Sequence, residues 1–142
     1  MREVLSEQSF GVFAFSGEGD DPPYTSVMFF AETPGLEIVF CTGGSGKLQL
    51  AREGSGACVQ IDNREIGLDR FTEFTRVTVQ GKLHRATGEE QAQLLGLYVE
   101  KLPQAETFLK QPGLATLLLR PQRLVFSRGF AERFELEFPN SR

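Results

Sequence analysis

A cluster of glycines followed by a lysine is the clearest candidate for chemistry in this sequence. In the stretch FCTGGSGKLQLARE, Phe40–Glu53, an apolar run leads into the glycines and a helix-like segment begins at Lys47. Backbone N–H groups at glycines, a helix start and a lysine all favour a negatively charged ligand. The pattern therefore indicates an anion site; the alternative is a plain glycine-rich turn with a solvated lysine.

This loop does not fit the nucleotide P-loop. That motif has a glycine five residues before its Gly-Lys pair and a Ser or Thr directly after the pair. Here the pair is Gly46-Lys47, the earlier position holds Cys41, and Leu48 follows the lysine. No hydroxyl group is placed to bind Mg²⁺, so the sequence does not predict an NTPase.

Other side chains suited to catalysis or metal binding are few and scattered. Cys41 and Cys58 lie in strand-like runs without CxxC spacing, which is typical of small core or sheet residues. The one histidine, His84, falls on the polar face of a predicted strand, which argues against a Ser-His-Asp triad. A zinc site is disfavoured because no Cys/His cluster accompanies it. We assign no catalytic residue and no metal ligand from the sequence.

The composition is that of one globular domain over residues 1–142, long enough to form its own core. A net charge of −4 disfavours a general nucleic-acid binder. No apolar run approaches the roughly 18 residues of a membrane span. The first residues, MREVLSEQSF, contain no apolar stretch of the signal-peptide type. We therefore expect a cytoplasmic protein without nucleic-acid or membrane partners.

The pattern of apolar and polar residues predicts a mainly β protein with a few helices. The expected strands are Phe10–Phe15 (buried on both faces), Tyr24–Phe30, Leu36–Thr42, Ala57–Asp62, Phe71–Arg85, Leu114–Leu119, Arg123–Ser127 and Arg133–Phe138. The expected helices are residues 2–8, 47–53 and 87–102, the last opened by a capping box, Thr87-Gly88-Glu89-Glu90. Hairpin connections dominate, which predicts an antiparallel sheet that can curl into a barrel.

Three separated stretches agree in order and spacing with the motifs of one family. The first is Phe40-Cys41-Thr42 followed by Ser45-Gly46-Lys47, where the family has aromatic-Tyr-Thr and then Ser-x-Lys. The second is Val77-Thr78-Val79-Gln80-Gly81, matching Val-x-Val-x-Gly. The third is PQRLVFSRG, Pro121–Gly129, followed by Arg133, where the family has Pro-x-x-Ile-x-Phe-Trp-Gln-Gly and an arginine. Through this ordered set the chain resembles the FMN-binding split barrels related to pyridoxamine 5'-phosphate oxidase.

The resemblance, which covers about Phe10 to Phe134, implies a six-stranded antiparallel split barrel. It also implies a homodimer with one FMN at each of two equivalent interface sites. The residues that it implies for FMN are Ser26, Val27 and Met28 along the flavin ring; Thr42, Ser45, Gly46 and Lys47 around the phosphate; and Arg76, Arg128 and Arg133 around the crevice. Lys47 would be a charge-assisted donor, and Thr42 and Ser45 neutral donors. Arg76 replaces a glutamine that touches the flavin, and we hypothesise that it stabilises negative charge on the reduced ring.

The chain also departs from the oxidase. The oxidase has an arginine in the second strand that binds the FMN phosphate, whereas Tyr24–Phe30 contains no basic residue. The Arg-x-His that binds the substrate phosphate reads Arg133-Phe134-Glu135, and Ser127-Arg128 replaces Trp-Gln. We therefore do not predict oxidation of pyridoxamine phosphate. The loss of one charged hydrogen bond to FMN would cost about 1.5–3 kcal/mol, roughly ten- to a hundredfold in affinity.

Two functions follow from the resemblance. The first is an FMN-binding oxidoreductase of unknown substrate. The second is a non-enzymatic split-barrel dimer that binds or senses a flavin, the deazaflavin F420 or haem, or that has lost its cofactor. F420 would need more basic residues near its tail than this acidic chain offers. Haem would need an axial ligand, for which the candidates are His84, Cys41, Cys58 and Tyr24.

Overall fold

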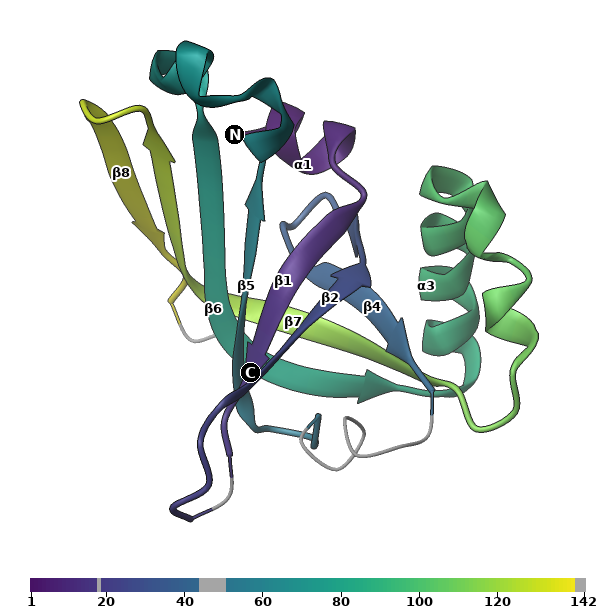
Figure 1. Cartoon of the computed structure of the whole chain (residues 1–142). Coiled ribbons are helices and arrows are strands. Elements are labelled where there is room, and N and C mark those ends of the chain that lie inside the picture. The colour runs from purple at the N-terminus through teal and green to yellow at the C-terminus, as the bar shows by residue number, and fades with distance from the viewer. Residues whose placement is uncertain (18, 44–50, 140–142) are drawn as a thin grey trace.

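The computed structural model describes residues 1–17, 19–43 and 51–139, and its main feature is a curled antiparallel sheet (Figure 1). The strands are β1 (Phe10–Phe15), β2 (Tyr24–Phe29), β3 (Ala31–Glu32), β4 (Ile38–Thr42), β5 (Gly56–Asp62), β6 (Thr75–Ala86), β7 (Ala115–Arg128) and β8 (Glu132–Glu137). The helices are α1 (Arg2–Glu7) and α3 (Gly88–Lys101), with 3-10 turns η1 (Arg64–Ile66), η2 (Leu68–Glu73), η3 (Pro103–Ala105) and η4 (Phe108–Lys110).

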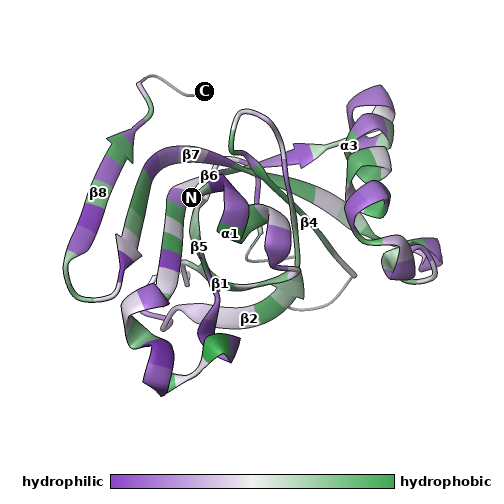
Figure 2. Cartoon of the chain, turned by 90° about the horizontal axis from the view of Figure 1, so that it is seen from above, coloured by the Kyte–Doolittle hydropathy of each residue, from purple (hydrophilic) through white to green (hydrophobic). Residues whose placement is uncertain are grey.

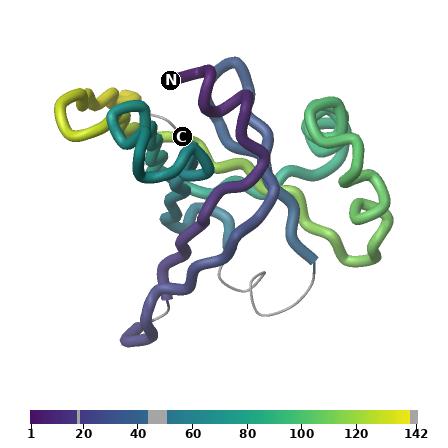
Figure 3. Tube along the Cα trace, turned by 45° about the horizontal axis from the view of Figure 1, so that its top comes forward, coloured from purple at the N-terminus to yellow at the C-terminus, as the bar shows by residue number. Residues whose placement is uncertain are grey.

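The sheet has the order β2-β1-β5-β6-β7-β4-β3, and β8 pairs with β7. All of these pairings are antiparallel. The long strands β6 and β7 bend, and the sheet curls until β2 and β4 contact one another (Figure 1). This confirms the predicted split-barrel architecture. The predicted last strand, Arg133–Phe138, corresponds to β8, whereas the two-residue β3 was not predicted. β8 lies on one side of the barrel and α3 on the other (Figures 1 and 3).

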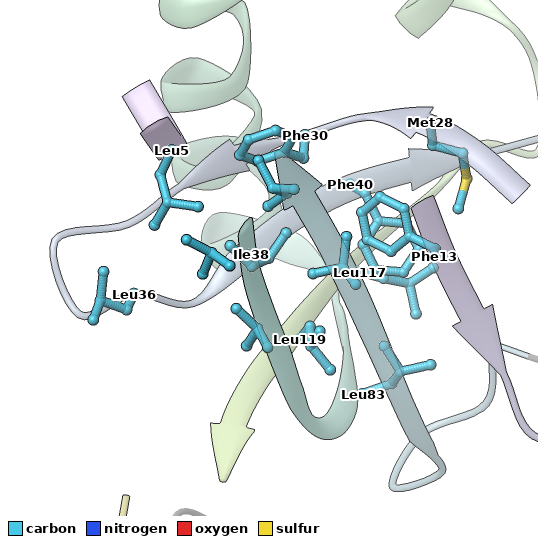
Figure 4. Close-up of a cluster of buried hydrophobic side chains, with 14 of the residues drawn as sticks. Leu5, Phe13, Met28, Phe30, Leu36, Ile38, Phe40, Leu83, Leu117 and Leu119 are labelled. Atoms are coloured by element: carbon cyan, nitrogen blue, oxygen red, sulfur yellow. The ribbon is translucent and has the colours of Figure 1, made fainter. Parts of the chain in front are cut away.

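The core fills the inside of the curl. Along β6, residues Thr75, Val77, Val79, Gly81 and Leu83 are buried, as the predicted alternation requires. Similar alternation appears as green and purple bands along the strands in Figure 2. Side chains that project into the same interior in Figure 4 include Leu5, Phe13, Phe30, Ile38, Phe40, Leu117 and Leu119. Leu5 belongs to α1, so this short helix is anchored in the core.

Three predictions about the strands are wrong. The strand predicted to begin at Phe71 begins at Thr75, because the preceding residues Leu68–Glu73 form η2. Phe10–Phe15 is not buried on both faces: Phe13 and Phe15 point into the core, whereas Phe10 is 54% exposed. The two strands predicted around Pro121 are one strand, β7. The β6–β7 register shifts there, so that Gln80 faces Arg123 and Gly81 faces Pro121. This irregularity accommodates a residue that has no N–H to donate.

Helix α3 packs on the outside of β4 and β7. A second apolar cluster fills this contact and consists of Ala31, Val39, Cys41, Tyr98, Leu102, Ala105 and Leu118. Strand β4 is therefore buried along its whole length, with the barrel core on one face and α3 on the other. The predicted capping box is not formed: the Thr87 side chain makes no cap bond, and Glu90 contacts His84 instead.

The predicted helix 47–53 falls mostly outside the described residues. Of its positions, the structure describes 51–53, which form a bend and a turn leading toward β5.

Candidate functional site

The ends of β2 and β4 form one wall of a cavity of about 280 Å³. β2 contributes Val27, Met28 and Phe29, and the end of β4 contributes Cys41 and Thr42, followed by Gly43. Three of these residues, Val27, Met28 and Thr42, were predicted to bind a cofactor. They belong to two segments that are well separated in the sequence. The curl of the sheet brings them together because it closes β2 against β4.

The segment after β6 contributes two aromatic residues to the lining. Tyr98 of α3 and Phe108 of η4 line the cavity. Tyr98 is almost wholly buried, and Phe108 is half-buried against the same apolar cluster. Neither was predicted as a site residue. Tyr98 was recognisable as part of the apolar stripe of a helix, but the stripe does not indicate which strand the helix covers.

The described lining of this cavity carries no charged side chain. Burial raises the pKa of the Cys41 thiol to about 11, although a 3.7 Å contact with the Thr116 hydroxyl opposes the shift. Burial also raises the pKa of the Tyr98 phenol, and the neighbouring Cys41 adds to this effect. Both groups are consequently protonated and neutral at physiological pH.

Gly43, the first residue of the glycine loop, lines this cavity. The Thr42 hydroxyl donates a long hydrogen bond of 3.4 Å to the Gly43 carbonyl. Three residues predicted to surround the phosphate, Ser45, Gly46 and Lys47, lie outside the described residues. Ser26 is half-buried on β2 but does not line the cavity.

The three predicted arginines lie away from this cavity in a single chain. Arg76 on β6 donates to the Gly129 carbonyl at 3.2 Å and stacks over Phe74 at 5.2 Å, while its Nε is buried without a partner. Arg128 at the end of β7 donates to the Thr75 hydroxyl at 3.3 Å.

The third arginine, Arg133, lies on β8 and bonds Glu135 at 2.7 Å. None of the three lines the cavity beside Thr42.

A second cavity of about 340 Å³ lies on the other side of Val27. Its lining comprises Gln8, Phe10, Gly11, Val12, Val27, Gln60, Asp62, Arg64 and Glu65. Asp62 is buried and receives 2.8 Å bonds on both carboxylate oxygens from the Arg64 guanidinium. Burial acts to raise the pKa of Asp62, but hydrogen bonds from Arg64 and Gln60 outweigh it and lower the pKa below its usual value. This cavity therefore differs from the first in being lined by paired charges.

The residues considered as iron ligands are dispersed. The ring nitrogens of His84 contact Glu53 at 3.2 Å and Glu90 at 2.8 Å. Cys58 is half-buried on β5, and Tyr24 is 42% exposed at the start of β2. Within residues 1–17, 19–43 and 51–139, no group of three His, Cys, Asp or Glu side chains is arranged to hold a metal ion. Of the four candidates, only Cys41 lines the first cavity.

No protein-family model matches this chain, and no curated protein matches its sequence significantly. Solved structures do match it. A haem-binding protein from Mycobacterium smegmatis superposes with a TM-score of 0.80 at 20% identity, covering 96% of this chain and 55% of that one. A Clostridium acetobutylicum protein of the pyridoxinephosphate oxidase family, related to general stress protein 26 of B. subtilis, gives 0.70 at 11% identity, covering 96% and 90%. An FAD-binding protein from Mesorhizobium loti gives 0.68 at 15% identity, covering 88% and 89%.

These similarities establish the class to which the fold belongs. The chain has the split-barrel fold found in proteins of the pyridoxinephosphate oxidase family and in flavin- and haem-binding proteins. It spans about half the length of the mycobacterial protein. At identities this low, the likeness concerns the fold alone. None of the described helices is long and apolar enough to cross a membrane.

Proposed function

We propose that this protein is an FMN-dependent oxidoreductase that binds the flavin at the cavity between β2, β4 and α3. The observation that carries the proposal is the convergence of Val27, Met28 and Thr42 on one cavity. Gly43, where the glycine loop begins, also lines that cavity, so the predicted phosphate loop directly follows the apolar site in the sequence. Flavin-binding proteins of the same fold support this assignment.

The residues present fit the two ends of FMN. Val27, Met28 and Phe29 offer an apolar surface to the ring. The Thr42 hydroxyl can exchange its long bond to Gly43 for a phosphate oxygen, and Ser45 and Lys47 follow in the loop. FMN supplies the redox chemistry when bound, while the chain provides binding, orientation and exclusion of water. No catalytic side chain is required, in keeping with the absence of a predicted one.

A second copy of the chain would complete this site. The cavity lies just below the roughly 300–1,000 Å³ usual for ligand pockets, so one chain encloses only part of a flavin nucleotide. Val27 at its rim is 63% exposed, and Phe10 nearby is 54% exposed. The predicted Arg76, Arg128 and Arg133 could reach the flavin only from such a partner chain. We therefore propose a homodimer.

Haem is the weaker alternative, although proteins of this fold bind it. The one candidate iron ligand that lines the cavity is Cys41, whose thiol is buried, contacts Thr116 and has a pKa of about 11. A thiol must lose its proton to ligate iron, and burial opposes that loss.

Both cysteines are free, as expected in the cytoplasm, where we propose the protein works.

An FMN titration followed by flavin fluorescence tests the proposal. We expect saturable binding with a dissociation constant in the micromolar range. Lys47→Ala should weaken it at least about tenfold by removing a charged hydrogen bond, and Thr42→Val about fivefold by removing a neutral one. Lys82→Ala is the matched control, because it removes the same charge from an exposed position on β6.

Absence of saturable FMN binding by the folded wild-type protein would contradict the proposal. Equal weakening by Lys47→Ala and Lys82→Ala would show that the lysine acts only through net charge. A shift of the haem Soret band on mixing with the protein, absent in Cys41→Ser, would favour the haem alternative. Once FMN binding is established, reduction of the bound flavin by candidate electron donors tests whether the protein is an enzyme.

A further inference from the structure

Strand β8 leaves one edge of the sheet open. Its residues pair with β7 on one side, and among the described residues no strand pairs with them on the other (Figures 1 and 2). All six residues of β8 are exposed. The other end strands differ, because β2 closes against β4 and β3 is two residues long. β8 is therefore a place at which the barrel can accept a further strand.

The hydrogen bonding of β8 shows which backbone groups face this open edge. The Phe138 N–H, just after β8, donates to the Gln122 carbonyl of β7 at 3.0 Å. In an antiparallel pair, residues that bond the neighbouring strand alternate with residues that do not. The even-numbered residues of β8 therefore bond β7. The backbone N–H and C=O groups of Arg133, Glu135 and Glu137 point to the open edge.

One face of β8 carries apolar side chains that are only partly covered. Phe134 stacks on Phe126 at the border of the core, with ring centres 5.0 Å apart, yet Phe134 is 47% exposed. Leu136 lies on the same face of the strand and is 38% exposed. A strand added at the open edge would extend this face and cover both side chains with its own apolar residues.

The charges of β8 determine what else such a strand carries. β8 contains three glutamates and one arginine. Glu135 is already engaged, because Arg123 and Arg133 donate to it at 2.6 and 2.7 Å. Glu132 and Glu137 stand at the two ends of β8, opposite the ends of an added strand. Opposite charges across a strand pair stabilise it and like charges destabilise it, so basic residues are favoured at both positions.

The arginine of β7 that lies across from Glu132 is directed elsewhere. Arg128 is the register partner of Glu132, but its guanidinium donates to the Thr75 hydroxyl at 3.3 Å. Arg128 also lies one strand further from the open edge than Glu132 does. The charge that an added strand meets first is therefore that of β8 itself.

Charge is also what keeps this edge from pairing indiscriminately. Natural proteins commonly block an open edge with a proline, a bulge or a covering segment. The segment Glu132–Glu137 contains no proline, and its register with β7 is unbroken. A second copy of β8 is disfavoured as the added strand, because it would bring the same excess of glutamate to the edge.

We propose that β8 binds an extended segment of another protein as an added antiparallel strand. The segment carries basic residues opposite Glu132 and Glu137 and apolar β-branched residues beside Phe134 and Leu136. Backbone hydrogen bonds to β8 hold it, and these side chains select it. This inference goes beyond the proposed function and does not depend on the flavin.

A synthetic peptide, Lys-Val-Thr-Val-Thr-Lys, blocked at both termini and carrying a fluorophore, tests the inference. In the antiparallel arrangement its first lysine lies opposite Glu137 and its last opposite Glu132, with the valines beside Leu136 and Phe134. Fluorescence anisotropy on the full chain should show saturable binding with a dissociation constant below about 1 mM. The matched peptide Glu-Val-Thr-Val-Thr-Glu should bind at least about fivefold more weakly.

N-methylation of the basic peptide locates the backbone contact and leaves the protein unaltered. A methyl group on the nitrogen of the third residue, opposite Glu135, faces β8. It should weaken binding at least about tenfold, because it removes a hydrogen bond and obstructs the approach of the strand. A methyl group on the nitrogen of the fourth residue, opposite Phe134, points away from β8 and should change the affinity by less than about threefold.

Charge reversal on the protein locates the side-chain contact. The double variant Glu132→Lys, Glu137→Lys should reverse the preference between the two peptides. The control is Glu100→Lys with Glu106→Lys, which changes the net charge equally at exposed positions in and after α3, on the other side of the barrel (Figure 1). It should keep the preference for the basic peptide. Circular dichroism checks that both variants fold.

Several outcomes would overturn the inference. They are no saturable binding of the basic peptide, equal binding of the two peptides, equal effects of the two methyl groups, or an unchanged preference in the folded β8 variant. A mass in light scattering that falls when the peptide is added would show that a second copy of the chain occupies the edge, contrary to the inference. FMN binding is measured separately, and its failure leaves this inference standing.

Discussion

At Gly81, strands β6 and β7 come so close that no side chain can fit between them. A Cβ added to Gly81 would overlap the carbonyl oxygen of Arg120 and press on Pro121. This explains in physical terms why the Val-x-Val-x-Gly stretch ends in glycine: the register shift that accommodates Pro121 needs a residue without a side chain on the facing strand.

We predict that Gly81→Ala destabilises the protein by about 2 kcal/mol or more, since the contact is with backbone and can be relieved only by moving a strand. Urea unfolding followed by circular dichroism measures the loss. Gly96→Ala is the control: Gly96 is exposed on α3, a Cβ there meets nothing within 4 Å, and alanine should stabilise by up to about 1 kcal/mol. A stable Gly81→Ala would show that β7 can shift freely.

At the scale of elements, His84 joins three separate segments. Its ring nitrogens contact Glu53, in the turn before β5, and Glu90, in the first turn of α3. The Arg85 N–H also donates to Glu53 at 2.7 Å, and Arg120 lies 4.0 Å from Glu90. Only a doubly protonated imidazole can donate to both carboxylates. The hydrogen bond to Glu90 is the main cause that raises the pKa of His84. Burial acts to lower this pKa, and the hydrogen bond to Glu53 acts to raise it further.

The sign of the pH dependence follows from that shift. A raised pKa in the folded state gives stabilisation that is complete below the unfolded value of about 6.5 and is lost as the pH rises through the folded value. We compare the free energy of unfolding of wild type with that of His84→Gln at two pH values. We predict that the advantage of wild type is about 0.5 kcal/mol larger at about pH 6 than at about pH 8.5. The effect is small because both carboxylates are largely exposed. Urea titrations at the two pH values measure it, and an equal difference at both would contradict it.

Lys101 at the end of α3 ties that helix to the N-terminal segment. Its ammonium donates to the Glu32 carboxylate at 2.7 Å and to the Leu5 carbonyl at 2.8 Å, and it lies 3.8 Å from the centre of the Phe30 ring. Burial lowers the pKa of Lys101, and the bond to Glu32 opposes that shift. The three contacts therefore hold α1, β3 and α3 together around one half-buried charge.

We predict that Lys101→Met destabilises the protein by about 1–3 kcal/mol, because it leaves the Glu32 carboxylate and the Leu5 carbonyl without their donor. Lys110→Met, which removes the same charge from an exposed position on η4, should change stability by less than about 0.5 kcal/mol. Thermal unfolding of both variants makes the comparison. Equal losses would mean that the contacts of Lys101 contribute nothing beyond its charge.

What the sequence could predict differs between these elements. Alternation in β6 predicted its buried face because the side-chain period of a strand is a local property. The sequence did not predict that β7 continues past Pro121, because this depends on a register shift against its partner strand β6. It also did not predict the loss of the capping box, because Glu90 contacts a histidine from β6. In the site, Thr42 was found through a motif, and Val27 and Met28 through what the family resemblance implies for the second strand. Tyr98 and Phe108 were missed, because their place depends on how α3 packs over β4.

For the whole molecule, the outer face of β1 and β2 is the surface on which association is expected. Phe10 and Val27 lie on it, more than half exposed, and Phe10 stacks on Phe29 with ring centres 4.6 Å apart. Between them runs the cavity that includes Gln60 and Val12. Apolar side chains gathered beside an incomplete ligand cavity are typical of an interface between subunits.

We predict that light scattering at about 50 μM gives twice the mass of one chain. Phe10→Asp should raise the dissociation constant of the dimer at least about tenfold, because a charge would be buried at the interface without a partner. Leu68→Asp is the control, since Leu68 is 89% exposed on η2, outside both cavities. If the proposed site needs both copies, FMN affinity should fall with dimer affinity in Phe10→Asp and stay unchanged in Leu68→Asp. A folded, monomeric wild type that binds FMN fully would show that one chain suffices, and Arg76, Arg128 and Arg133 would then have no part in binding.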